Sequence, residues 1–360
     1  MVRARLRTSL LDWYARTRRD LPWRRVRDPY AIWVSETMLQ QTRVETVIPY
    51  YERFMRELPT MLSLAEAPEE RVLALWSGLG YYRRARMLHA AAKQVAESHG
   101  GRIPEEAGEL LKLEGVGRYT AGAIASIAFG RRAALVDGNV ARVLSRLFAI
   151  EEDVKSARGA AALWRLAEEL VAGGADPGDW NQALMELGAT VCSPREPKCG
   201  ACPVRSECAA RERGLTASLP RSERRAQPIS VRRAAVVLAS CTHVLLARRR
   251  ADTSFGGLWE PPSAESEVAW LASSLGIDVH TLQSAGEVTH LLTHRRMHVD
   301  VVRGELPRKR KWSLPSAEYD AIERVALAEL GGPEPRAVSS LARKVLIVAN
   351  IPLGSLPWKK

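Results

Sequence analysis

Apolar residues recur at intervals of three or four through most of the first 210 residues of the chain. This spacing keeps one face of a helix buried, so the pattern predicts a mainly α-helical region. Pairs such as Asp28-Pro29 and Gly100-Gly101 mark starts and stops between the periodic segments. The predicted helices are 30–39, 44–58, 71–76, 85–95, 121–129, 141–147 and 161–171.

The N-terminal stretch Met1–Trp23 is rich in arginine and also reads as an amphipathic helix. A transit peptide is the alternative, but Asp12 and Asp20 interrupt its charge pattern. We therefore expect a folded helix and a protein of the reducing cytoplasm. The residues that fall on the apolar face of this helix are Leu6, Leu10, Leu11 and Tyr14.

The hydrophobic pattern changes in the C-terminal third of the chain. Short apolar and β-branched runs replace the helical spacing and predict strands at 234–240, 243–249, 287–302 and 345–351. The stretch 211–233 is basic and poor in apolar residues, so it is predicted to be a linker. We expect a helical region over 1–210, a linker over 211–233 and an α+β domain over 234–360.

Composition and charge narrow the class of protein. A chain of 360 residues with 46% hydrophobic residues has room for two cores, and no apolar run is long enough to cross a bilayer. The formal net charge is +12. A basic surface attracts polyanions, of which nucleic acid is the commonest, although charge alone favours it only weakly.

Four cysteines lie close together in the pattern C-x6-C-x2-C-x5-C, as Cys192, Cys199, Cys202 and Cys208. Clustered thiolates predict a metal site. A disulfide framework is disfavoured, because the chain is long and has no secretory signal. Structural zinc sites usually pair two C-x2–4-C units, and only one is present here, so the spacing leaves zinc and an iron–sulfur cluster both open.

A glycine-containing turn, Gly115-Val116-Gly117, joins two helical patterns within Leu110–Gly122. Glycines allow a tight turn, and the helix that follows offers free N–H groups and its positive dipole end to a phosphate. These are the parts of a helix-hairpin-helix motif, which grips a DNA backbone without reading sequence. An ordinary helix–helix turn is the alternative.

Two carboxylates stand in contexts that suit catalysis. Glu36 lies in the apolar segment Trp33–Thr42, where burial would raise its pKa, although a surface glutamate fits the pattern too. Asp137 precedes a predicted helix in Val136–Val140. It is either a helix N-cap or a carboxylate that faces a cationic reacting centre.

The cysteine spacing, the glycine turn and the segments around Glu36 and Asp137 together resemble the helix-hairpin-helix DNA glycosylases, and more narrowly the MutY-like adenine DNA glycosylases. The match runs from about residue 10 to 210 and more weakly to about 305. The resemblance implies a [4Fe–4S] cluster on the four cysteines. It also implies a six-helix hairpin module within about 22–132 and a cluster module from 1–21 and 133–210.

The resemblance implies a monofunctional enzyme of base excision repair that removes adenine mispaired with 8-oxoguanine or guanine. The adenine is flipped out of the duplex, Glu36 protonates it, and Asp137 opposes the positive sugar that remains. Tyr119 and Asn139 support these groups. Duplex DNA is the expected partner of a monomeric protein in the cytoplasm, at the nucleoid of a bacterial-type cell.

Two other functions stay open. The endonuclease III branch removes pyrimidine lesions and then cuts the strand, and it carries a lysine at the position of Tyr119 for Schiff-base formation. Tyrosine cannot form that adduct, so this bifunctional reading is disfavoured. A non-catalytic iron–sulfur DNA-binding protein is the second alternative, against which Glu36 and Asp137 argue, since a carboxylate weakens binding to a polyanion.

Further contacts are expected from the same resemblance. The adenine pocket is expected to contain Trp23, Arg24 and Gln182; the opposite base to meet Gln41 and Tyr81; the phosphates to meet Gly115, Val116, Gly117 and Arg118; and a monovalent cation to bind the carbonyls of Leu111, Leu113 and Val116. Glu114 stands where the family usually has proline, which places an extra anion near the DNA.

The C-terminal domain resembles the Nudix-like lesion-recognition domain of the same family. The loop Phe255–Pro262 fits its pattern, but the run of glutamates that binds Mg²⁺ in Nudix hydrolases is missing. The family's lesion-reading Phe-Ser-His appears here as Leu292-Thr293-His294. We therefore expect 8-oxoguanine recognition at this tripeptide, without the aromatic ring.

Overall fold

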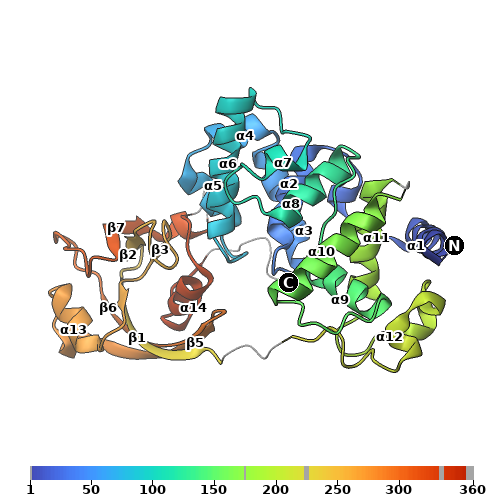
Figure 1. Cartoon of the computed structure of the whole chain (residues 1–360). Coiled ribbons are helices and arrows are strands. Elements are labelled where there is room, and N and C mark those ends of the chain that lie inside the picture. The colour runs from blue at the N-terminus through green and yellow to red at the C-terminus, as the bar shows by residue number, and fades with distance from the viewer. Residues whose placement is uncertain (1, 174–175, 223–226, 332–335, 354–360) are drawn as a thin grey trace. The chain divides into compact units, whose positions relative to one another are not determined.

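The computed structural model describes residues 2–173, 176–222, 227–331 and 336–353 (Figure 1), and its backbone contacts divide the chain into two units. The first unit comprises Met1–Ala65 and Ala90–Arg224, and the second comprises Glu66–His89 and Arg225–Lys360. Parts of the predicted linker and of the predicted C-terminal domain, at 223–226, 332–335 and 354–360, lie outside the described residues. The helical segment 66–89 thus groups with the C-terminal part of the chain.

Helices make up all the regular secondary structure in the described residues of the first unit. Its elements are α1 (Val2–Thr17), η1 (Pro22–Arg24), α2 (Pro29–Leu39), α3 (Val44–Glu57), α4 (Met61–Glu66, whose last residue opens the second unit), the end of α6 (Arg83–His99), α7 (Ala107–Leu110), α8 (Arg118–Ala123), η2 (Ile124–Ala128), α9 (Gly138–Leu147), α10 (Ala157–Val171), α11 (Pro177–Thr190), η3 (Cys199–Ala201), η4 (Arg205–Glu207) and α12 (Ala209–Glu212).

The predicted N-terminal helix is confirmed as α1. Leu6, Leu10 and Tyr14 repeat every four residues and are each at most 2% exposed. They join a core built from α9, α10 and α11. Burial of this face, rather than the helix propensity of an Arg-rich segment, holds α1 in place.

Side-chain caps define where the helices of the site begin. Asp28 accepts a hydrogen bond from Tyr30 N (3.0 Å) ahead of Pro29, and Asp176 accepts one from Asp179 N (3.0 Å). All of α2 from Tyr30 to Met38 is buried, although Ser35, Glu36 and Thr37 are polar, because most of the helix is apolar. The polar residues within it are therefore taken into the interior.

The glycine turn forms a tight connection between α7 and α8. Gly115 has φ 70°, a conformation that favours glycine, and Gly117 is the N-cap of α8. The helix then passes into η2, a π-helical turn. Gly122 allows a close approach here, since a Cβ atom on it would lie 1.9 Å from the carbonyl oxygen of Ala134.

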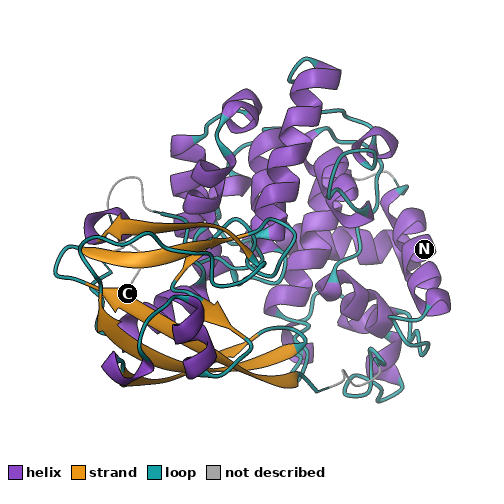
Figure 2. Cartoon of the chain, turned by 90° about the vertical axis from the view of Figure 1, so that its left-hand side faces the viewer, coloured by secondary structure: helices purple, strands orange, loops and turns teal. Residues whose placement is uncertain are grey.

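The second unit is built around one mixed sheet, whose strands are orange in Figure 2. The strand order is β3-β2-β1-β6-β5, with β4 on β1 and β7 on β2, and β1 and β6 are parallel. Its elements are α5 (Glu69–Trp76), the start of α6, β1 (Ile229–Ala239), β2 (His243–Arg249), β3 (Trp259–Glu260), β4 (Ser263–Ala264), α13 (Val268–Ser274), η5 (Val279–Thr281), β5 (Gln283–Leu291), β6 (Arg295–Glu305), β7 (Tyr319–Ala326), η6 (Leu327–Leu330) and α14 (Ser340–Val348).

Strand β1 explains the continuous apolar run in this part of the sequence. Ala235 and Val237 point to a core shared with α14, while Val236 and Leu238 point to a second core shared with α13. A strand buried on both faces has no polar side, so the alternation is lost. β1 begins at Ile229, within the segment expected to be a linker, and pairs with β6 from that residue onward.

The predicted strand at 345–351 is wrong, because residues 340–348 form helix α14. The run Val345-Leu-Ile-Val is rich in β-branched residues, but Leu341, Ala342, Val345 and Leu346 are buried at helical spacing. The Ser339 hydroxyl also caps the helix by accepting a hydrogen bond from Ala342 N (2.9 Å). Packing on the sheet and the cap override the local β preference.

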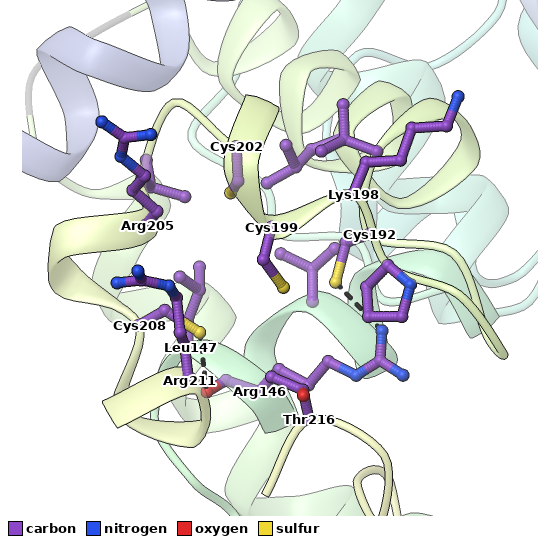
Figure 3. Close-up of a pocket in the computed structure, with 15 residues that line it drawn as sticks. Arg146, Leu147, Cys192, Lys198, Cys199, Cys202, Arg205, Cys208, Arg211 and Thr216 are labelled. Carbon is purple, nitrogen blue, oxygen red and sulfur yellow. Dashed lines mark hydrogen bonds between the residues drawn. The ribbon is translucent and has the colours of Figure 1, made fainter. Parts of the chain in front are cut away.

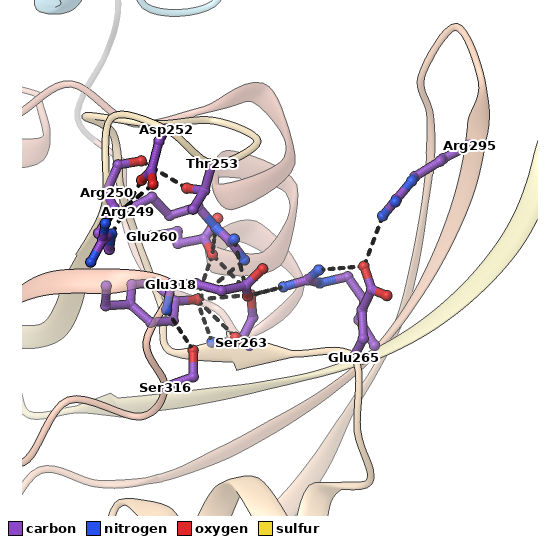
Figure 4. Close-up of polar contacts among 12 residues, drawn as sticks. Arg249, Arg250, Asp252, Thr253, Glu260, Ser263, Glu265, Arg295, Ser316 and Glu318 are labelled. Atoms are coloured by element: carbon purple, nitrogen blue, oxygen red, sulfur yellow. Dashed lines mark hydrogen bonds and ion pairs between the residues drawn. The ribbon is translucent and has the colours of Figure 1, made fainter.

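A polar network joins the strands of the second unit near the loop Phe255–Pro262 (Figure 4). The buried Glu260 carboxylate accepts hydrogen bonds from Arg249 Nε (2.7 Å) and the Tyr319 hydroxyl (2.7 Å). Ser263 Oγ also donates to it (2.9 Å). A buried charge is tolerated only when it is paired in this way, so the network fixes how β2, β3, β4 and β7 meet.

Candidate active site

Glu36 lies in the middle of α2 and is only 5% exposed. The Tyr119 hydroxyl, on α8, donates a hydrogen bond to its Oε2 atom. The same hydroxyl oxygen lies 3.5 Å from the sulfur of Met185 on α11. The structure thus buries the glutamate that the sequence singled out and brings it together with Tyr119.

Asp137 is the N-cap of α9. Its Oδ1 accepts a hydrogen bond from Val140 N (2.6 Å), and its Oδ2 accepts one from Asn139 Nδ2 (2.9 Å). The prediction that Asp137 is a helix N-cap is therefore confirmed. A cap at a helix start does not prevent a second role, because each carboxylate oxygen keeps a free lone pair.

Burial dominates the protonation of both carboxyl groups. It raises the pKa of Glu36 to about 7, with the Tyr119 hydrogen bond opposing the rise and the charge of Asp137 adding to it. Burial also raises the pKa of Asp137, against the hydrogen bonds from Val140 and Asn139. The charge of Asp137 raises the pKa of both Glu36 and Tyr119, which supports placing the three groups in one site, and Glu36 is the group that can hold a proton near neutral pH.

The expected adenine-pocket residues line a common hollow. Trp23 and Arg24 come from η1, and Gln182 comes from α11. Arg24 does not point freely into it, because its Nη2 donates to Glu186 Oε2 at 2.9 Å. Trp23 is 5% exposed and packs edge-on against Tyr51, with ring centroids 5.3 Å apart.

Glu186 is a site residue that the sequence analysis missed. It is 1% exposed, and burial acts to raise its pKa, but the hydrogen bonds from Arg19 and Arg24 prevail and lower it. Glu186 therefore stays ionised and holds Arg24 at the pocket. Its position four residues after Gln182 on one helix was a usable signal, since such residues share a face.

Arg142 on α9 is the second missed residue. Its Nη2 donates to Asn139 Oδ1 (2.9 Å) and to Gly188 O (2.9 Å), and its Nε donates to Cys192 O (2.8 Å). It fixes the amide of Asn139 so that the nitrogen faces Asp137. Gly188 makes this approach possible, because a Cβ atom there would lie 2.6 Å from the Cβ of Asn139.

The four clustered cysteines line one hollow beside α9, and Figure 3 shows their sulfur atoms facing the same space. Arg146 borders it, with Nη1 3.3 Å from the sulfur of Cys192 and hydrogen bonds to the carbonyls of Ser193 and Pro194. Within the described ranges, no three His, Cys, Asp or Glu side chains are arranged to hold a single metal ion. Four sulfurs beside a buried cation suit an anionic group bound through thiolates.

Two contacts border the hairpin residues Gly115–Arg118. Arg118 stacks on Trp164, with its guanidinium carbon 3.9 Å from the ring centroid, and pairs with Glu168 at 2.8 Å. Glu114 donates its backbone N–H to Gln94 Oε1 at 2.7 Å. A proline at position 114 has no N–H, so this hydrogen bond exists only because the chain departs from the family pattern.

Gln41 and Tyr81 both have left-handed backbones, with φ 59° and 51°. Such conformations are costly for residues other than glycine and cluster at functional sites. Gln41 follows the C-terminus of α2 and is exposed, and Tyr81 is 46% exposed. Exposed side chains on constrained backbones suit residues that enter a duplex.

The tripeptide Leu292-Thr293-His294 forms the turn between β5 and β6. Leu292 packs partly against the core that contains α14, whereas Thr293 and His294 are exposed. The loop therefore offers a hydroxyl and an imidazole to solvent, while its first side chain turns inward. No helix in the described part of the chain is long and apolar enough to span a membrane.

Two family descriptions match the chain: "HhH-GPD superfamily base excision DNA repair protein" over residues 34–169, and "NUDIX domain" over 233–346. Human adenine DNA glycosylase is 56% identical over 216 residues, covering 58% of this chain and 39% of the human protein. The Arabidopsis thaliana adenine DNA glycosylase is 38% identical over 357 residues, covering 82% of this chain and 56% of that protein. The chain thus spans about half the length of these curated relatives.

A solved structure of a thermostable thymine-DNA glycosylase is 34% identical to the chain, with a TM-score of 0.54. The match covers 59% of this chain and 97% of that one. Sequence and fold therefore agree on the same family for the helical region, which is where Glu36, Tyr119 and Asp137 lie.

Proposed function

The chain belongs to the HhH-GPD superfamily of base excision DNA repair proteins, and we propose that it is a monofunctional DNA glycosylase that removes adenine mispaired with 8-oxoguanine or guanine. The observation that supports this most is the buried Glu36 with a pKa of about 7, beside Tyr119 and Asp137. A buried acid that is half protonated at neutral pH suits proton donation to a leaving base.

The reaction follows from the chemistry of these side chains. Glu36 gives its proton to N7 of the flipped adenine, which makes the base a better leaving group as the C1′–N9 bond breaks with its electron pair on the base. The sugar is left with positive charge, and the Asp137 carboxylate, held by Val140 and Asn139, stabilises it. Glu36, now a carboxylate, takes a proton from the water that attacks C1′.

Tyr119 determines the reaction type in this proposal. A lyase reaction needs an amine to form a Schiff base with the sugar, and a phenol whose pKa is raised well above its ordinary value cannot supply one. Tyr119 instead orients Glu36. The product is an abasic site in an unbroken strand.

The cysteine loop fits a [4Fe–4S] cluster bound by Cys192, Cys199, Cys202 and Cys208. The cluster would cross-link the loop that follows α11, and Arg146 would offset its negative charge. Arg142 ties the backbone of this loop to Asn139. Through these contacts the cysteine loop holds α9, and therefore Asp137, in one position.

The remaining contacts complete the proposal. Duplex DNA binds through the hairpin at Gly115–Arg118, with a monovalent cation at the carbonyls of Leu111, Leu113 and Val116, and the Nudix-like domain reads 8-oxoguanine at residues 292–294. The protein acts as a monomer at the nucleoid. The proposed domain limits are 1–210 and 234–360, joined by a linker over 211–233 whose last residues, from Ile229 on, already belong to strand β1.

The test uses four duplexes, which carry adenine opposite 8-oxoguanine, adenine opposite guanine, thymine opposite guanine, and an oxidised pyrimidine. We expect strand breaks only for the two adenine duplexes, and only after alkali treatment. Thymine release would favour the substrate named for the thermostable relative. Breaks without alkali, together with borohydride trapping of the protein on DNA, would favour the lyase reading.

A further inference from the structure

The hydroxyl groups of Tyr81 and Thr293 meet within the second unit, with Oη and Oγ1 3.5 Å apart. Tyr81 lies just before α6, in the segment 66–89, and Thr293 lies in the β5–β6 turn. The two residues are more than two hundred positions apart in sequence, at a separation of 212. A residue expected to enter the duplex thus touches the tripeptide expected to read the lesion.

Residues of the segment 66–89 itself contact the Tyr81 ring. Arg84 stacks between Trp76 and Tyr81, with centroid distances of 5.6 and 5.2 Å. Trp76 Nε1 and Arg84 Nη2 both donate to the carbonyl of Gly80, at 3.2 and 3.1 Å. Gly78 and Gly80 have φ 102° and 78°, which glycine adopts without strain, whereas Tyr81 at φ 51° has a conformation that is costly for a residue with a side chain.

The same turn is tied to the C-terminal part of the chain. Ser77 Oγ donates to Val338 O (2.7 Å), Arg343 Nη2 donates to Ser77 Oγ (2.8 Å), and the Tyr82 hydroxyl donates to Val338 O (3.3 Å). These contacts fix the backbone that carries Tyr81. The phenol oxygen, at the far end of the ring, meets Thr293 Oγ1.

The β5–β6 turn presents Thr293 in a defined way. Leu292 N donates to Arg295 O at 2.8 Å, which closes the turn, and the Leu292 side chain packs inward. The Leu292 side chain therefore packs in the core and does not stack on a base. Of the tripeptide, Thr293 is the member that meets Tyr81.

We propose that Thr293 determines which base is accepted opposite the adenine by positioning Tyr81, so that the two hydroxyl groups act as one specificity-determining pair. This inference rests on the proposed function. It differs from a direct lesion contact by Thr293, because it requires the effect of Thr293 to pass through the Tyr81 hydroxyl. The two contributions must then be non-additive.

The experiment uses the full chain and the ratio of single-turnover adenine-release rates opposite 8-oxoguanine and opposite guanine. Thr293→Val and Tyr81→Phe each remove one hydroxyl and keep the shape of the side chain. We expect each to lower the ratio about fivefold, the effect of one hydrogen bond, and the double variant to lower it no further. Thr293→Ser, which keeps the hydroxyl, should retain the wild-type ratio.

Thr289→Val is the matched control, since Thr289 is an exposed threonine on the adjacent strand β5. It should leave the ratio unchanged, and melting temperatures should show that every variant is folded. The ratio of equilibrium affinities for the same duplexes, measured in a Glu36→Gln background, gives a readout that does not need base release.

A double variant whose loss equals the product of the two single losses would overturn the inference, because the hydroxyls would then act independently. Unchanged ratios in both single variants would overturn it as well. An unmodified protein that neither releases adenine nor prefers an 8-oxoguanine duplex contradicts the proposed function instead. The two failures are thus distinguishable.

Discussion

Tyr119 donates its hydroxyl hydrogen to Oε2 of Glu36, and this one contact opposes the effect of burial on the same carboxyl group. Burial favours the protonated acid, and the hydrogen bond favours the carboxylate. The balance leaves the pKa of Glu36 at about 7, so neither form dominates at neutral pH. A residue that must first give a proton and then take one from water needs that balance.

The pH dependence of base release follows from this pair. Release requires protonated Glu36, so its single-turnover rate should fall as pH rises through about 7. Tyr119→Phe removes the hydrogen bond that lowers the pKa, and the falling limb should move to higher pH. A rate–pH profile from pH 5.5 to 9 checks this. If the falling limb of Tyr119→Phe lies at the same pH as that of the unmodified protein, the Tyr119 hydrogen bond does not set the pKa of Glu36.

Glu36→Gln should reduce base release by at least ~100-fold, because an amide neither donates nor retrieves the proton. Binding to the duplex should persist, since Gln keeps the shape of the side chain. Gel-shift and single-turnover assays on one preparation distinguish the two effects. Turnover near that of the unmodified protein would remove Glu36 from the mechanism.

The same variant should change how stability depends on pH. The pKa of Glu36 is raised on folding from its ordinary value of 4.5 to about 7, so the folded state binds the proton more tightly. Stability due to this group is present below 4.5 and is lost as pH rises to about 7, at a cost of roughly 3 kcal/mol. The melting temperature of Glu36→Gln should exceed that of the unmodified protein at pH 8 by more than at pH 5.

Asp137→Asn separates capping from catalysis. Asparagine caps helices about as well as aspartate, so the melting temperature should change little. Base release should collapse, because the neutral amide cannot stabilise a positive sugar. If activity survives with the cap, Asp137 is a structural residue only.

The cysteine loop predicts both colour and metal content. Protein purified without oxygen should be yellow-brown and contain about four iron atoms per chain. Cys199→Ser should lose iron and solubility, since the loop would lose its cross-link. Cys241→Ser is the matched control, because Cys241 is exposed and lies outside the group. One zinc and no iron would contradict the cluster.

Local patterns predicted what depends on local spacing. The helices of the first unit, the burial of Glu36 in a mostly apolar segment and the grouping of four cysteines are of this kind. Helix α14 was predicted as a strand because Val345-Leu-Ile-Val favours a strand locally. A run of four residues is too short to show the helical spacing of its buried positions. Arg142 was missed because its contacts with Gly188 and Cys192 lie on other segments, and Glu186 because its spacing from Gln182 does not show that Arg19 and Arg24 bind it.

The inward turn of Leu292 and the contact of Tyr81 with Thr293 were also beyond reach of the sequence. Both depend on residues that are far apart along the chain. Comparing the tripeptide with a family pattern position by position does not show where each of its side chains points. That orientation assigns Leu292 to the core and leaves the hydroxyl as the informative group.

The chain contributes to the second unit twice, first at 66–89 and again from 225 onward. A ribosome therefore releases the first contribution long before its partners Val338 and Arg343 have been made. The segment with Trp76 and the turn at 78–81 therefore lacks these partners for most of synthesis. Destabilising changes near α14 should then reduce the yield of soluble protein more than they reduce the stability of the finished molecule.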